Sequence, residues 1–135
     1  MININEYLLG KGKTKKYNVK KPEKGCEPQD IIDWLDSFGV DNWYSDHSIL
    51  ECPEKGRVGY HIMNGSWGNK LVALDIAMSE FIRQSICVYP KFDNSYISWG
   101  FGRQDKKISF DTGIKLMEQI MENPAEAKIL KKDEI

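Results

Sequence analysis

Several features that classify proteins are missing from this sequence of 135 residues. No apolar run approaches the ~20 residues that a membrane-spanning helix needs, and the chain opens without the basic and apolar segments of a signal peptide. No proline-rich or other low-complexity linker interrupts it, and only 5 residues are proline. We therefore expect a single cytoplasmic domain over residues 1–135, without membrane contact.

The cysteines and histidines do not suggest a metal site or a disulfide. The chain has an odd number of cysteines, and they form no C-x-x-C motif: Cys26, Cys52 and Cys87. The two histidines are His47 and His61. Residues five apart in a strand, such as His47 and Cys52, point to opposite faces and cannot share an ion. We predict reduced thiols, no bound metal and no cofactor.

Motifs for catalysis are incomplete. Gly12-Lys13-Thr14 matches the end of a phosphate-binding loop, but the glycine required five residues before Gly12 is replaced by Tyr7. Phe110–Gly113 resembles the active-site triplet of retroviral-type aspartic proteases, yet only 22 residues follow it. A helix cap explains these residues better. The sequence therefore favours binding over catalysis.

Apolar spacing predicts an α+β fold, with a mostly antiparallel sheet of five or six strands packed by two or three helices. A helix is expected at 28–38, with Ile31, Leu35 and Phe38 inward. Another is expected from a cap at Asp111 or Thr112 to Asn123, with four inward residues: Ile114, Met117, Ile120 and Met121. Residues 70–84 predict a third helix capped by Asn69, although Lys70–Ala77 also alternates like a strand. Other strands are expected at 14–20, 48–52, 57–63, 86–91, 96–101, 107–110 and 128–130, with 48–52 and 57–63 as a hairpin.

Charge is unevenly distributed, although the net charge is only −1. Residues 11–24 hold seven lysines and one acid, so residues 1–24 form a basic N-terminal segment. Residues 25–54 hold eight acids and no lysine or arginine. Residues 125–135 are a charged tail that we expect to fray. A negative segment of this kind attracts cationic partners and raises their association rate.

Aromatic residues in expected loops indicate protein recognition, because Trp and Tyr are enriched among the residues that dominate binding energy. We predict a non-catalytic inhibitor or immunity-type protein that binds a basic protein partner through an acidic, aromatic surface. The expected contact residues are Asp30, Asp33, Asp41, Trp43, Tyr44, Asp46 and Trp67.

A second class of function stays open. The chain could instead sequester a nucleotide or another small ligand, with a phage or mobile element as its source. In that case phosphate would be bound by Lys15, Lys16, Arg57 or Arg103. Nucleic acid is a less favoured partner, because the basic segment has lysines but no arginine to reach bases.

Overall fold

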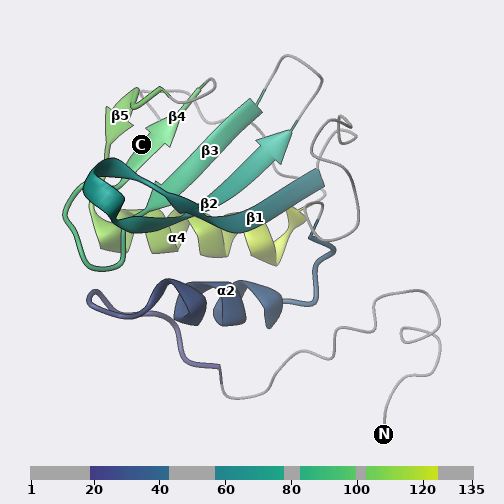
Figure 1. Cartoon of the computed structure of the whole chain (residues 1–135). Helices are drawn as coiled ribbons and strands as arrows, with labels where there is room; N and C mark the ends of the chain where they lie inside the picture. The colour runs from purple at the N-terminus through teal and green to yellow at the C-terminus, as the bar shows by residue number, and fades with distance from the viewer. Residues whose placement is uncertain (1–18, 43–56, 78–82, 100–102, 125–135) are drawn as a thin grey trace, which may run out of the picture.

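The computed structural model describes residues 19–42, 57–77, 83–99 and 103–124. These residues form a five-stranded antiparallel sheet and two α-helices (Figure 1). The strands lie side by side in chain order: β1 (Arg57–Asn64), β2 (Lys70–Ala77), β3 (Arg83–Val88), β4 (Tyr96–Ser98) and β5 (Lys106–Lys107). The α+β fold predicted from the apolar spacing is confirmed.

Helix α2 (Pro28–Asp36) starts where the sequence predicts, with Pro28 in the first turn. A capping box satisfies its N-terminus: Glu27 and Asp30 bond reciprocally, and the Glu27 N–H lies 2.9 Å from Asp30 Oδ2. Gly39 follows the helix with a φ of 69°, a conformation that glycine adopts without strain. The side chains that α2 buries are Ile31, Trp34 and Leu35, whereas Phe38 is half-buried.

Residues 70–77 are a strand, so the helix predicted over 70–84 is wrong and its strand alternative is correct. β2 pairs with both β1 and β3. Val72, Leu74 and Ile76 are buried in the main core on one side, while Leu71 and Ala73 are buried on the other. The sequence of a central strand that is covered on both faces is a nearly continuous apolar run, and its pattern cannot be distinguished from that of a buried helix.

Helix α4 (Phe110–Glu122) begins earlier than predicted. The cap is Ser109 rather than Asp111 or Thr112, and its Oγ accepts a hydrogen bond from the Thr112 N–H at 3.1 Å. Phe110, which we placed at the end of a strand, is therefore the first helical residue. The predicted inward positions are confirmed as buried: Ile114, Met117, Ile120 and Met121.

Both helices contribute to one core on the same face of the sheet (Figure 1). Helix α2 packs against β1 and β2, and α4 packs against β3. The opposite face carries a smaller buried cluster, Leu71, Ala73, Cys87 and Tyr89. Among the described strands β1 is at one end of the sheet, and it lies over α2 (Figure 1).

Some predicted features lie outside the described residues: the strands at 48–52 and 128–130, most of the strand at 14–20 and of the basic segment, and the tail at 125–135. The two described residues of the strand at 14–20, Val19 and Lys20, are not in a strand. The strand predicted at 57–63 is confirmed as β1, and its neighbour in the sheet is β2. Over the described ranges, neither helix has the length and apolar character needed to cross a bilayer.

Candidate functional site

The β1–β2 connection presents an exposed tryptophan on a constrained backbone. Ser66–Gly68 form a short 3-10 helix between the two strands. The Trp67 residue is 94% exposed, and its φ of 57° lies in the left-handed region that residues with a Cβ rarely occupy. Such a conformation costs about 1–3 kcal/mol and persists only when its surroundings enforce it.

Hydrogen bonds at both ends of the turn enforce this backbone. The Gly65 N–H donates to the Asn69 carbonyl at 2.7 Å, and the Asn69 N–H returns a bond to the Ser66 carbonyl at 3.0 Å. From below, the hydroxyl of buried Tyr89 accepts the Ser66 N–H at 2.8 Å. These hydrogen bonds therefore hold the backbone of the turn in place, with Trp67 exposed to solvent.

A second aromatic residue and a hollow adjoin this turn. Phe92 is 37% exposed and packs edge-on against Tyr89, with ring centroids 5.6 Å apart. We call the group Gly65–Asn69 with Phe92 the Trp67 tip. A hollow of about 210 Å³ beside it is lined by Glu27, Pro28, Gly68, Asn69, Lys70, Pro90, Lys91 and Phe92.

The outer edge of β1, which no described strand pairs, is partly closed by one side chain. Buried Asn42 donates from Nδ2 to the Tyr60 carbonyl at 2.9 Å, and its Oδ1 accepts the Tyr60 N–H at 3.0 Å. The amide thus bonds Tyr60 as a neighbouring strand would. Towards the Trp67 tip, Ile62 on the same strand is 38% exposed.

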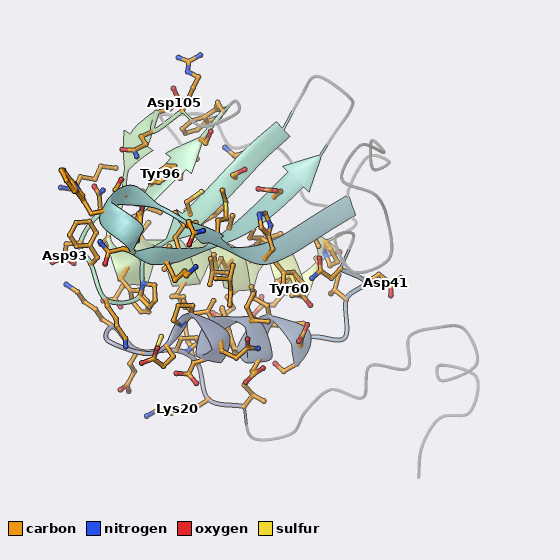
Figure 2. The ribbon with its side chains drawn as sticks, in the orientation of Figure 1. Lys20, Asp41, Tyr60, Asp93, Tyr96 and Asp105 are labelled. Atoms are coloured by element: carbon orange, nitrogen blue, oxygen red, sulfur yellow. The ribbon has the colours of Figure 1, made fainter. Side chains whose placement is uncertain are left out.

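Two carboxylates, Asp36 and Asp41, lie near Tyr60. Figure 2 shows Tyr60 and Asp41 on the α2 side of β1. The Tyr60 hydroxyl donates to Asp36 Oδ1 at 2.5 Å. Burial raises the pKa of Tyr60 above its usual value, and the bond to Asp36 and the charges of Asp36 and Asp41 raise it further. Two described carboxylates, Asp36 and Asp41, therefore lie near this end of the β1 edge.

The predicted acidic contact residues are not on one surface. Asp30 and Asp33 line a hollow of about 400 Å³. Lys20 and Lys21 also line it, and their ammonium groups pair with Glu23 and Glu118. Asp41 is exposed on the β1 side of α2 and forms no ion pair with a described residue. The other predicted contact residues Trp43, Tyr44 and Asp46 lie outside the described ranges.

The residues predicted for phosphate binding are not brought together where the structure describes them. Lys15 and Lys16 lie outside its ranges, and Arg57 is described only as part of the β1 backbone. Exposed Arg103 pairs with Asp105, with Nε 3.1 Å from Oδ1. Arg57 is in β1, and Arg103 follows β4. Two strands lie between β1 and β4, so β1 and β4 are about 14 Å apart at ~4.8 Å per strand spacing.

The described thiols, Cys26 and Cys87, are free, and Cys52 falls outside the described ranges. No three potential metal ligands cluster within the part of the chain that the structure covers. Burial raises the pKa of Cys87 to about 12, against the lowering effect of a hydrogen bond with Tyr96. Cys87 is therefore a protonated packing residue at neutral pH, not a nucleophile.

This burial predicts a loss of stability in alkali. The unfolded thiol ionises near pH 9.0 and the folded thiol near 12. The stabilising contribution of the protonated Cys87 thiol to the free energy of unfolding is therefore complete below pH 9.0 and is lost as the pH rises to 12. In Cys87→Ala, the urea midpoint should fall less between about pH 8 and about pH 10.5 than in the wild type. The raised pKa of Tyr60 acts equally in both proteins. The pKa of Tyr96 is raised by burial and in part by Cys87, so the substitution also reduces the alkaline loss that comes from Tyr96, in the same direction. Parallel pH curves for the two would refute the assignment.

Comparison with known proteins gives no family: no protein-family model, no curated protein and no solved structure matches the chain.

Three residues of this region were not predicted as functional: Asn42, Tyr89 and Phe92. Asn42 bonds a strand residue 18 positions later, and no local pattern identifies such a contact. For the turn there was a local signal, since Gly65 and Gly68 flank Trp67.

Proposed function

We propose that this chain is a non-catalytic binding protein of the inhibitor or immunity type, whose partner is a basic protein of the cytoplasm. The observation that carries the proposal is Trp67, exposed on a left-handed backbone that Tyr89 and Asn69 hold in place. A protruding tryptophan on a backbone that is already held in place loses little backbone freedom on binding and fills a partner pocket with a large apolar area. Strained backbone of this kind is also concentrated at binding sites.

Charge and redox state support the rest of the proposal. The described stretch 25–42 contains five acids and no lysine or arginine. Of these acids, Asp41 is exposed and lies near Tyr60 on the β1 side of the molecule. A cationic surface is the chemistry that complements it. The free thiols Cys26 and Cys87 are compatible with a reducing compartment.

The test is partner capture with the tagged wild type and Trp67→Ala. Proteins from the source cell that the wild type retains should be lost with the variant. Truncating a central aromatic anchor typically costs ~2–4 kcal/mol and accelerates dissociation. Dissociation of the captured partner, followed by surface plasmon resonance, measures this effect directly.

A matched control is Gln119→Ala, a change to an exposed residue of α4. Both variants should melt within about 2 °C of the wild type, because surface changes rarely exceed ~0.5 kcal/mol. Capture that is equal for Trp67→Ala and Gln119→Ala would refute the role of Trp67. A nucleotide-dependent rise in melting temperature that Lys15→Ala or Lys16→Ala abolishes would instead establish the ligand-binding alternative.

A further inference from the structure

Next to the Trp67 tip, the outer edge of β1 carries backbone groups that no described strand pairs. In a strand that is paired on one side, every second residue points its N–H and C=O away from the paired neighbour. Tyr60 is such a residue of β1, because Asn42 bonds its N–H and C=O from outside the sheet. The same alternation places the backbone groups of Ile62 and Asn64 on that edge. In the described ranges no backbone hydrogen bond outside the sheet involves either residue, and Ile62 is 38% exposed.

We infer that the partner binds by strand addition: one of its extended segments pairs with β1 at Ile62 and Asn64, and Trp67 packs on one end of that segment. The inference rests on the proposed function and specifies how its site works. Exposed sheet edges bind extended peptides through main-chain hydrogen bonds, with side chains adding specificity. Lysines, prolines and inward charges usually protect such edges, and the stretch 60–64 has no lysine, acid or proline.

Asn42 fixes where this pairing stops. Its amide already bonds the outward groups of Tyr60, so a docked strand cannot pair at that residue. From Tyr60 to Asn64 the edge runs about 13 Å at ~3.3 Å per residue. A segment of about five residues therefore reaches from Trp67 at one end to the carboxylates beside Tyr60 at the other.

Those carboxylates determine the chemistry of the segment. Asp41 near Tyr60 is exposed and forms no ion pair with a described residue, so a lysine or arginine of the partner at this end lies against its negative charge. A second copy of this chain would offer its own stretch 60–64, which contains no lysine or arginine. The complementary occupant is therefore a basic extended segment of another protein, with an apolar side chain for Trp67.

The probe is a peptide of about eight residues that alternates lysine and valine, which is basic and prone to extended structure. A fully N-methylated copy keeps its side chains and charge but cannot donate backbone hydrogen bonds. A glutamate/valine copy keeps the backbone and reverses the charge. NMR of the 15N-labelled full chain follows the Ile62 and Asn64 amides during each titration.

The lysine/valine peptide should slow hydrogen exchange at the Ile62 and Asn64 amides by about five-fold or more, as one hydrogen bond of ~1 kcal/mol implies. N-methylation and charge reversal should each weaken binding by at least about five-fold. Equal binding of the N-methylated peptide, or no binding of the lysine/valine peptide, overturns strand addition. Equal binding of the glutamate/valine peptide overturns the basic segment.

Ile62→Pro tests the edge from this chain's side. It removes an N–H that faces away from β2, so the β1–β2 ladder keeps its bonds. Peptide affinity should fall about five-fold, whereas Ile62→Val, which retains the N–H, should stay within about two-fold. If Ile62→Pro does not fold, the N-methylated peptide on the wild type decides.

Failure of the inference is distinguishable from failure of the proposed function. Partner capture lost with Trp67→Ala but unchanged with Ile62→Pro overturns strand addition and leaves the binding function in place. Capture that is unchanged with both variants overturns both. A wild-type dimer in sedimentation velocity that Ile62→Pro dissociates makes the second copy the occupant and overturns the basic partner.

Discussion

Gly65→Ala should destabilise the protein by about 2–5 kcal/mol, because the added methyl group has no room and its neighbour is bonded in place. A Cβ at this position would run into the Tyr89 hydroxyl and lie 2.6 Å from Cε1 and Cζ of the same ring. Tyr89 is buried, so the ring cannot swing into solvent. If it shifts, the Ser66 N–H loses its acceptor at 2.8 Å.

The neighbouring glycine provides the control. Gly68 has a φ of 75° and open space around its Cβ position, so Gly68→Ala should cost only backbone strain, about 1–2 kcal/mol. Urea unfolding of both variants measures the difference. Gly65→Ala combined with Tyr89→Phe should cost less than the sum of the single changes, since both remove the same hydrogen bond. Additive costs, or equal costs at Gly65 and Gly68, would contradict the packing described for Tyr89.

Sequence patterns identified the elements that are amphipathic. Helix α2 was predicted from one apolar stripe with Pro28 at its start, and α4 from the inward set that ends at Met121. The spacing of apolar residues did not identify β2 as a strand, because Leu71 and Val72 are both buried in a strand that is covered on both sides. Neighbouring strands create that environment, so alternation along residues 70–77 alone could not decide between helix and strand.

The site was predicted in part for a similar physical reason. Trp67 was identified from its loop position, and it is exposed there. The charge pattern predicted one acidic surface, but folding places Asp30 and Asp33 beside the lysines of the preceding segment and Asp41 on the other side, near Tyr60. Proximity across the fold cannot be read from linear charge. The closure of the β1 edge by Asn42 depends on the same kind of long-range contact.

Leu35→Ala should be the most damaging change in α2, with a loss of about 2–5 kcal/mol in the free energy of unfolding. Leu35 is 0% exposed and belongs to the main core, where α2 packs on β1 and β2. Truncation removes buried methyl groups and leaves a cavity that a helix fixed at both ends closes poorly. Gln29→Ala, an exposed change on the same helix, should stay within about 0.5 kcal/mol.

Asp36 of α2 accepts a hydrogen bond from the Tyr60 hydroxyl, so the destabilisation that Leu35→Ala causes in α2 should extend to the β1 edge. Amide exchange at Tyr60, whose N–H is bonded by Asn42 just beyond the helix, should accelerate in Leu35→Ala even under conditions where the protein remains folded. Gln29→Ala should leave that exchange rate at the wild-type value. A Leu35→Ala protein with an unchanged urea midpoint would show that α2 does not anchor the sheet, and that its register against β1 and β2 is wrong.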